Sequence, residues 1–358
     1  MTKVVRAVLR RLCLPLVRPY KLSYRTFDAF EPFFLELVDD SGASAFSDAH
    51  VSPGSSLETR EGAWSWCLES LKTLGASDIE TQKHGLAARK HESKVAATLM
   101  VTALEFLGGS KWLKIDRDFT NGLLVPINSI DEVAIEPEIE ALLAEGFKAF
   151  KVKVGKDRDG DIRRVNTILD VLDGRAMISI DANRAYSRED AIWFARRLTR
   201  SGIELFEQPC AADAWDDNAA VAGECPIPLM LDEPICSLAD IERAAGIDNV
   251  GFCKVKLKRF GGLDLLAEGI QSVHAHGMQA VLGDGLGSEI NNWMEAAVAS
   301  KLIRTRGEFN GFLKHKDRLL LNPLPFDHGS IKLAAGYVPQ LDRESIERLT
   351  TEVRVFEY

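Results

Sequence analysis

The sequence contains little cysteine and no long apolar run. None of its six cysteines forms a C-x-x-C pair or stands with histidines at zinc-ligand spacing, which favours reduced thiols in a cytoplasmic protein. No stretch approaches about 18 uncharged apolar residues, so no membrane span is predicted. Arg10 and Arg11 interrupt the apolar segment near the start of the chain, so we expect no signal peptide there.

An excess of positive charge is also absent. The formal net charge is −9 at pH 7, which argues against a nucleic-acid partner. An anionic ligand would therefore be attracted by local cations or by a metal ion rather than by the overall field. With 358 residues, the chain is expected to form one large domain and a smaller one.

Regions with different patterns follow one another along the chain. Residues 1–115 combine a predicted strand at 32–38 with predicted helices at 56–73 and 94–107, which indicates an α+β domain. The second helix is apolar on several faces and should be buried. From residue 116 to residue 325, short apolar runs alternate with longer amphipathic stretches, as is typical of βαβ units. We expect residues 326–358 to return and pack on the first domain as a C-terminal segment.

The second region contains eight strand candidates, at 123–126, 149–154, 177–180, 204–206, 229–231, 250–257, 279–283 and, more weakly, 306–309. Eight βα units are what a closed (β/α) barrel needs, whereas an open doubly wound sheet, the alternative, usually stops near six strands. The sequence therefore predicts an α/β fold. It consists of a modified (β/α) barrel with an α+β capping domain built from the N-terminal region and the C-terminal tail.

Ionisable residues stand at or near the ends of six predicted strands. They are Lys153, Asp181, Glu207, Asp232, Lys256 and Asp284, and successive members are 24 to 28 residues apart, or one βα unit. All strands of a parallel barrel end at the same face, where barrel enzymes have their active sites. These side chains should therefore converge on one mouth.

The types of residue in this set indicate the chemistry. Three carboxylates from consecutive strands, Asp181, Glu207 and Asp232, suit Mg²⁺, with Mn²⁺ as a substitute, and without a metal they would repel one another. Lys153 and Lys256 flank them on opposite sides of the barrel. An amine beside a divalent cation can act as a base, while the cation stabilises charge developing on a substrate carboxylate. We therefore predict abstraction of the proton α to a carboxylate, through an enolate.

Five short motifs resemble those of the muconate-lactonising subgroup of the enolase superfamily, in the mandelate racemase/muconate lactonising enzyme family. In chain order they are Lys151-Val152-Lys153 (K-x-K), Asp181-Ala182-Asn183 (D-x-N), Glu207-Gln208-Pro209 (E-Q-P), Asp232-Glu233-Pro234 (D-E-P) and Lys256 to Gly262 (K-x-x-x-x-G-G).

The resemblance implies roles for these residues. Asp181, Glu207 and Asp232 would bind magnesium, and Lys153 and Lys256 would act as acid and base. The further substrate-binding candidates are Lys151, which would position the substrate carboxylate, together with Asn183, Asp284 and Glu308. The resemblance also implies a small carboxylate substrate and a homo-oligomer, either a dimer or an octamer.

The sequence departs from the family pattern in three places. The segment Gly283–Glu289 replaces G-x-M-x-E-S, and the segment around Glu308 lacks the D-x-D with which dipeptide epimerases hold an ammonium group. Lys254 stands where a neutral residue is usual. Two capping-domain loops, 16–26 and 47–56, are expected to cover the mouth and to contribute Arg18, Lys21, Arg25 and His50.

Several reactions remain open at this point. Because both lysines are present, we favour racemisation or epimerisation of an amino-acid-like carboxylate. Syn-elimination by a dehydratase or an o-succinylbenzoate-synthase-like lyase, and cycloisomerisation of a muconate-like acid, share the same first step. A Schiff-base aldolase would not need three acids in phase, and a non-catalytic scaffold would need neither the acids nor the lysines.

Overall fold

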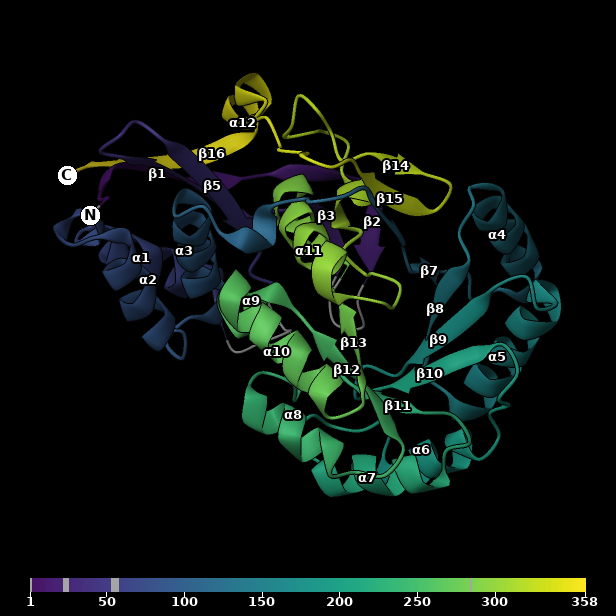
Figure 1. The fold of residues 1–358 in the computed structure, drawn as a ribbon. Coiled ribbons are helices and arrows are strands. Elements are labelled where there is room, and N and C mark those ends of the chain that lie inside the picture. Colours follow the sequence, from purple (N-terminus) through teal and green to yellow (C-terminus); the bar gives the residue numbers. More distant parts are fainter. Residues whose placement is uncertain (1, 22–25, 53–57, 284) are drawn as a thin grey trace.

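The computed structural model describes the chain except residues 1, 22–25, 53–57 and 284. A capping domain with an antiparallel sheet lies against a curled parallel sheet surrounded by helices (Figure 1). The predicted fold class, a modified (β/α) barrel with an α+β cap, is therefore confirmed.

The sheet of the cap has the order β16-β1-β4-β5, and all its neighbours are antiparallel. Its strands are β1 (Val4–Leu12), β4 (Phe33–Asp39), β5 (Ser44–Ala49) and β16 (Thr350–Glu357). The register pairs Arg6 with Glu357 and Leu9 with Leu35. The returning tail thus supplies an edge strand of the cap.

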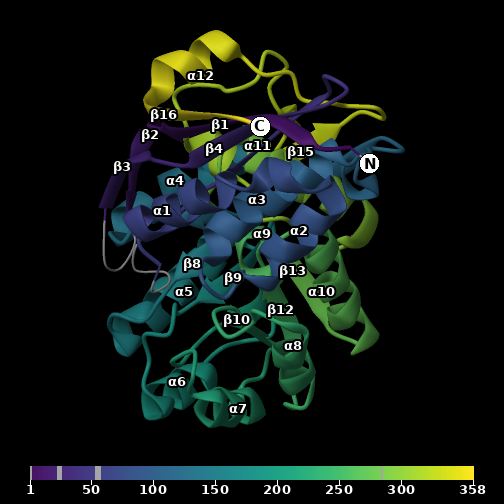
Figure 2. The same cartoon turned by 90° about the vertical axis from the view of Figure 1, so that its left-hand side faces the viewer.

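Three helices cover one side of this sheet (Figures 1 and 2): α1 (Arg60–Leu71), α2 (Ile79–Ala88) and α3 (Lys94–Leu107). The α3 helix is apolar on almost every side, and all residues from Val95 to Glu105 are buried. It therefore lies between the sheet and the barrel rather than on the surface. A hairpin of β2 (Leu14–Lys21) and β3 (Thr26–Phe30) completes the described strands of the cap.

The barrel sheet is parallel and has the order β13-β12-β11-β10-β9-β8-β7. Its strands are β7 (Val125–Ile127), β8 (Ala149–Lys153), β9 (Met177–Asp181), β10 (Ile203–Glu207), β11 (Leu229–Leu231), β12 (Val250–Val255) and β13 (Gln279–Leu282). The helices outside it (Figure 1) are α4 (Glu132–Ala144), α5 (Arg158–Leu172), α6 (Arg188–Ala195), α7 (Trp215–Glu224), α8 (Leu238–Ala245), α9 (Leu257–Phe260), α10 (Leu263–Ala275) and α11 (Glu289–Leu302).

The strand expected at 306–309 is wrong in detail, because the described chain forms no strand there. Gly307 makes a single parallel bridge with Leu123, and the amide of Glu308 donates to the carbonyl of Leu282, 2.8 Å away. Leu123 lies just before β7, and Leu282 ends β13. Gly307 and Glu308 therefore connect the two edge strands of the sheet. The curl is closed by a short stretch of backbone rather than by a full eighth strand.

Alternate residues of the strands point into the barrel. Leu205, Met230, Phe252 and Val281 form a small buried apolar cluster there, one from each of four neighbouring strands. Two positions after Leu205, Met230 and Phe252 come the ionisable residues Glu207, Asp232 and Lys254, whose side chains point to the same side. The apolar layer therefore forms a floor on which ionisable side chains stand.

Two cap carboxylates bind the N-termini of barrel helices. Asp48 of β5 accepts the backbone N–H of Asn291 at 2.6 Å, in the first turn of α11, and Glu105 of α3 accepts those of Leu263 and Asp264 at 2.6 and 2.9 Å, at the start of α10. Helix N-termini carry unsatisfied N–H groups and partial positive charge, so both contacts hold the cap on the barrel.

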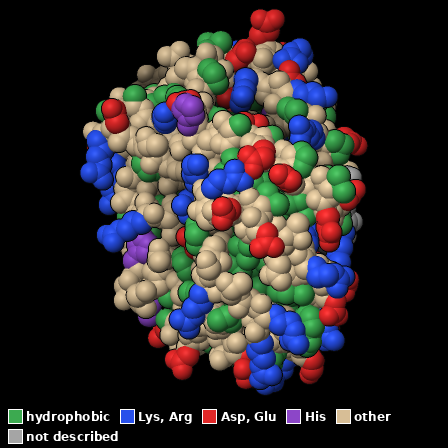
Figure 3. All heavy atoms as spheres, turned by 90° about the vertical axis from the view of Figure 1, so that its right-hand side faces the viewer, with side chains coloured by type: hydrophobic (Ala, Val, Ile, Leu, Met, Phe, Trp, Pro, Cys, Tyr) green, Lys and Arg blue, Asp and Glu red, His purple; other side chains and the backbone are tan. Residues whose placement is uncertain are grey.

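The remaining described elements are β6 (Phe119–Gly122), β14 (Phe326–Asp327), β15 (Ser330–Leu333), α12 (Arg343–Leu349) and the short 3₁₀ helices Leu74–Ala76, Lys111–Leu113 and Gly311–Lys314. All six cysteines are free thiols. Among the described helices, none is both long and apolar enough to span a bilayer. On the face shown in Figure 3, acidic and basic side chains are interspersed.

Candidate active site

Three acidic residues lie at the carboxyl ends of adjacent strands. Asp181 ends β9, Glu207 ends β10, and Asp232 follows β11 directly. Asp181 pairs in register with Glu207. All three residues are almost fully buried, at 1%, 1% and 3% exposure. The parallel register thus brings the predicted acids to one end of the barrel.

Two lysines of β8 contact these acids. Nζ of Lys151 lies 3.2 Å from Oδ2 of Asp181 and 2.7 Å from Oε2 of Glu207, so one ammonium group joins two carboxylates. Nζ of Lys153 lies 2.5 Å from Oδ2 of Asp181 and 2.6 Å from Oδ1 of Asn183. The side chain of Lys153 is 41% exposed and that of Lys151 only 5%, so Lys153 stands at the mouth and Lys151 below it.

On the other side of the acids, Lys256 and Arg259 contact Asp232. Nζ of Lys256 lies 2.9 Å from Oδ2, and the guanidinium of Arg259 lies 2.8 Å from Oδ1 and also donates to the backbone carbonyl of Asp232. Lys256 follows β12, whereas Lys153 ends β8, and the three acid-bearing strands lie between these two. The structure therefore places Lys153 and Lys256 on opposite flanks of the acids.

The charges of this cluster hold one another ionised. Burial alone would raise the pKa of Asp181, but the ammonium groups of Lys153 and Lys151 outweigh it and lower that pKa well below its usual range. Burial is likewise outweighed at Asp232, where Arg259 and Lys256 lower the pKa strongly. Burial also opposes the charge of Lys151, yet Glu207 and Asp181 raise its pKa.

A second layer of charge lies deeper in the barrel. Oε1 of Glu308 lies 2.7 Å from Nζ of Lys151, and its other oxygen forms an ion pair with Lys254. The side chain of Lys254 is 1% exposed, and burial together with Lys151 lowers its pKa to about 7. Both oxygens of Glu308 are engaged by lysines of the chain. Its predicted role as a substrate-binding residue stays a prediction.

Backbone geometry supports the acids. Asn183 and Gln208 both adopt positive φ, at 44° and 36°, directly after the strands that end in Asp181 and Glu207. The side-chain oxygen of Gln208 accepts the backbone N–H of Asp232 at 2.9 Å, and the N–H of Asn183 donates to Oδ1 of Asp181 at 2.8 Å. Sequence reasoning gave no role to Gln208 or Arg259, although both lie inside recognised motifs.

The donor chemistry of the three acids fits a hard divalent cation. Within the described residues, however, no group of three or more acidic, histidine or cysteine side chains has the geometry to hold a metal ion as it stands, and the three carboxylates contact lysine and arginine side chains. The neighbour of Asp232, Glu233, has a buried oxygen, Oε2, with no described hydrogen-bond partner. Burial raises the pKa of Glu233 to about 7, and the negative charge of Asp232 adds to this shift. The magnesium site therefore stays a prediction.

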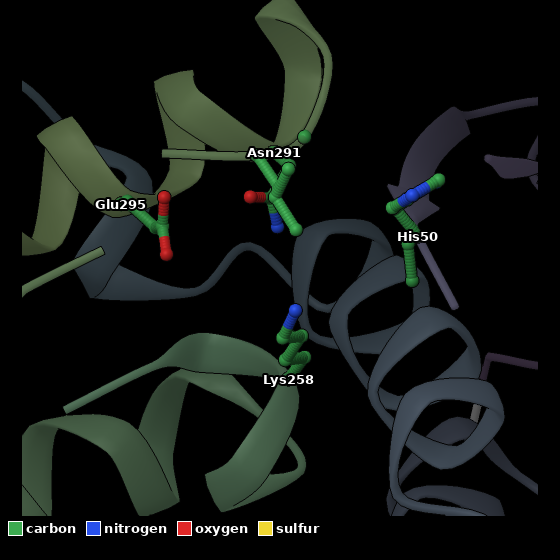
Figure 4. Close-up of a pocket in the computed structure, with 7 residues that line it drawn as sticks. His50, Lys258, Asn291 and Glu295 are labelled. Carbon is green, nitrogen blue, oxygen red and sulfur yellow. The ribbon is translucent and has the colours of Figure 1, made fainter. Parts of the chain in front are cut away.

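The expected loop contacts are only partly covered by the described residues. Asp284, Arg25 and the side chain of Lys21 lie outside them, and Arg18 is exposed. The ring of His50 lies 5.1 Å from that of Phe30. His50 also lines a small cavity between cap and barrel, where Lys258 extends toward Asn291 on α11, beside Glu295 (Figure 4).

Three glycines in the segment after β13 adopt positive φ: Gly283, Gly285 and Gly287. Gly283 has φ of 101°, and a Cβ there would lie 2.5 Å from the backbone nitrogen of Phe309. Gly287 has φ of 88°, and a Cβ would lie 2.6 Å from Oδ1 of Asn291. These positions require glycine for both conformation and space. The backbone conformation at Gly287 thus accounts for glycine at the position where the family pattern G-x-M-x-E-S has glutamate.

A family model described as enolase C-terminal domain-like matches residues 134–340, more than half of the chain. The chain belongs to the enolase superfamily. Solved structures with the same fold are those of mandelate racemase/muconate lactonising family enzymes. N-succinyl Arg/Lys racemase from Bacillus cereus ATCC 14579 superposes with a TM-score of 0.89 at 19% identity, covering 99% of this chain and 100% of that one. Muconate lactonizing enzyme from Pseudomonas fluorescens gives 0.86 at 20% identity, covering 98% and 99%.

Curated relatives of this superfamily member catalyse different reactions. The o-succinylbenzoate synthase of Geobacillus stearothermophilus is 28% identical over 98% of this chain and 96% of its own length. The L-Ala-D/L-Glu epimerase of Bacillus subtilis (strain 168) is 26% identical over 92% and 94%. The prediction that the chain is an isomerase or lyase of this superfamily is thus confirmed at that level, and the relatives do not agree on one reaction.

Proposed function

We propose that this enolase-superfamily enzyme removes the proton α to the carboxylate of a small substrate and returns a proton to the same carbon, as a racemase or epimerase. Lys153 and Lys256 are the proposed acid and base. The observation that carries the proposal is their placement: their ammonium groups stand on opposite flanks of three buried carboxylates, each in contact with one of them. A carbon held between the two amines could exchange protons on either face.

We further propose that Asp181, Glu207 and Asp232 hold Mg²⁺. A divalent cation at these carboxylates would stabilise the negative charge that develops on the substrate carboxylate. Lys153 and Lys256 have to leave their carboxylate partners to meet the substrate, and the 41% exposed side chain of Lys153 has room to do so. Lys151 stays below, held between Asp181 and Glu207, where it adds positive charge under the substrate carboxylate.

The presence of a lysine on each flank of the acids favours racemisation or epimerisation over the other reactions. The superfamily relatives include N-succinyl-L-Arg/Lys racemase from Bacillus cereus and several epimerases. Syn-elimination is the second candidate, because the 28% identical relative is an o-succinylbenzoate synthase. An eliminating enzyme needs only one lysine as base. Cycloisomerisation is the third, because muconate cycloisomerase 1 of Rhodococcus opacus is 26% identical over 91% of this chain.

A deuterium-exchange screen tests the proposal. N-acyl amino acids, dipeptides, hydroxyprolines and sugar acids are incubated with the protein and Mg²⁺ in D₂O, and deuterium at the α-carbon is measured. We expect uptake in at least one class, and EDTA should abolish it. Lys153→Met should reduce uptake by about 10³-fold for one antipode, and Lys256→Met should reduce it by about 10³-fold for the other. Lys332→Met, which removes an exposed lysine paired with Asp327, is the matched control and should leave uptake unchanged.

The outcomes separate the candidate reactions. Loss of exchange from one antipode only in each lysine variant supports racemisation or epimerisation, whereas a product lacking water, formed while one lysine variant keeps exchange, supports elimination. Activity that survives EDTA and is trapped by borohydride would instead show a Schiff-base aldolase. No uptake in any class would contradict the proposal.

A further inference from the structure

Two strands of the barrel each carry a pair of lysines with the same spacing. Lys151 and Lys153 lie on β8, and Lys254 and Lys256 lie on or directly after β12. Residues two apart on a strand point to the same side, so each pair has one member at the mouth and one below it. The deeper members, with side chains 5% and 1% exposed, are farther from solvent than Lys153 and Lys256.

Glu308 joins the two deeper lysines. One of its oxygens contacts Lys151 and the other contacts Lys254, and its residue is 8% exposed. Its backbone is fixed on both sides, because its N–H donates to Leu282 and its carbonyl accepts the N–H of Gly285, each at 2.8 Å. The carboxylate is therefore held at a set place between β8 and β12.

Neither buried partner is stable in this place without the other. A buried carboxylate or ammonium group that loses its counter-ion bears the full cost of desolvation. Lys151 has two further carboxylates within reach, Asp181 and Glu207, but Lys254 has Glu308 as its contact ion pair. Glu308 is thus one of three carboxylates that hold Lys151, and it is the one that contacts both deeper lysines.

We propose that Glu308 and Lys254 are positioning residues that fix the ammonium group of Lys151 beneath the substrate site. The inference rests on the proposed function for the role of Lys151, whereas the contacts among the three residues can be tested without it.

The first experiment measures unfolding by urea without metal or substrate. Glu308→Gln should raise the unfolding constant at least tenfold, because Lys254 loses its contact carboxylate and Lys151 loses one of its three. Adding Lys254→Met should recover part of that loss, since it removes one unpaired charge. In a Lys151→Met background, Glu308→Gln should have a clearly smaller effect. An equal effect in both backgrounds would overturn the proposal, whether or not the protein exchanges α-protons. Asp327→Asn, in the exposed pair with Lys332, is the control and should change the constant less than threefold.

The second experiment separates positioning from a merely structural ion pair. In the variant Lys254→Glu/Glu308→Lys the pair is reversed, so the two residues can still neutralise each other, but Lys151 now faces an ammonium group. We expect this variant, and Lys254→Met/Glu308→Gln, to exchange the α-proton at least tenfold more slowly than the wild type with Mg²⁺ present. Wild-type exchange by the reversed pair would show a structural role only. Lack of exchange in the wild type itself would contradict the proposed function. The urea-unfolding measurements of the first experiment would then still test whether Glu308 holds Lys151 and Lys254.

Discussion

Buried carboxylates occur in two regions of this molecule, at the mouth of the barrel and at the interface between barrel and cap. At the mouth, Asp181 and Asp232 face ammonium and guanidinium groups, which lower their pKa values. At the interface, Asp48 and Glu105 face backbone N–H groups, and burial raises their pKa values to about 6 and about 7. Buried carboxyl groups of the same kind therefore have lowered pKa values at the mouth and raised pKa values at the interface.

The difference between these regions follows from what each partner can do. A lysine side chain can swing away and leave a carboxylate for another cation, whereas a backbone N–H at a helix start has no other position. At the mouth, Lys153 and Lys256 are therefore the partners that can give way to the metal ion and the substrate that we propose, whereas Lys151 and Arg259 stay buried against the carboxylates. The interface is built from fixed partners, as a permanent contact between two domains requires.

The largest expected effect comes from removing a mouth carboxylate. Asp232→Asn leaves Lys256 and Arg259 buried without their counter-ion, so the free energy of unfolding should fall by about 3–5 kcal/mol. Urea denaturation measures it. Combining the change with Lys256→Met should recover part of the loss. A fall below about 1 kcal/mol would mean that water reaches these cations and that the mouth is less buried than the structure shows.

Magnesium should stabilise the mouth and not the interface. At a Mg²⁺ concentration one hundred times its dissociation constant, the wild type should gain about 2.7 kcal/mol of stability, because only the folded protein holds the site. Asp181→Asn should lose this gain, and Glu105→Gln should keep it. Thermal unfolding with and without Mg²⁺ measures both. Equal gains in all three proteins would place the ion elsewhere.

Removing an interface carboxylate should have a smaller effect. Glu105→Gln leaves only one acceptor oxygen for the two N–H groups of Leu263 and Asp264, but it also removes the buried charge that Glu105 carries at pH 8. The two effects oppose each other, so the free energy of unfolding at pH 8 should change by less than about 1 kcal/mol. Denaturation in urea would show it. A fall of about 3 kcal/mol or more would mean that the helix N–H groups stabilise the carboxylate more than burial destabilises it.

The smallest expected effect is the contribution of Glu105 at the interface to the pH dependence of stability. The pKa of Glu105 is raised to about 7 in the folded protein, above the value of about 4.3 for an exposed glutamate. The folded state therefore holds the proton more tightly, and this contribution to stability is full below pH 4 and disappears as the pH rises through 7. The wild type should exceed Glu105→Gln in stability by more at pH 5 than at pH 8. The opposite trend would mean that the helix N–H groups outweigh burial.

Much of this architecture could be predicted from the sequence, because its signals are local. The apolar run Lys94–Leu107 marks a buried helix, and the structure has a helix with those bounds. The period of one βα unit between Asp181, Glu207 and Asp232 predicts their shared end of the barrel, since parallel strands in register carry residues to the same height.

What the sequence did not predict depends on contacts between distant segments. The strand expected at 306–309 is a single bridge at Gly307, and its pairing partners, Leu123 and Leu282, lie more than 150 positions apart in the chain. The contacts of Asp48 with α11 and of Glu105 with α10 join residues 158 or more positions apart, and no local pattern marks them. The contacts of Glu308 with Lys151 and Lys254 likewise join distant strands, and the sequence did not predict them, while its role as a substrate-binding residue stays a prediction.

The pairing of β1 with β16 has a consequence for how the chain acquires its shape during synthesis. Leu12 and its partner Thr350 are separated in sequence by the entire barrel. The ribosome therefore synthesises every barrel strand before β16 is available to pair with β1. Until then one edge of an otherwise assembled sheet is open to pairing with any passing polypeptide. Nascent chains of this protein should therefore depend most on chaperones late in translation, when nearly all of the barrel has emerged and the last strand has not.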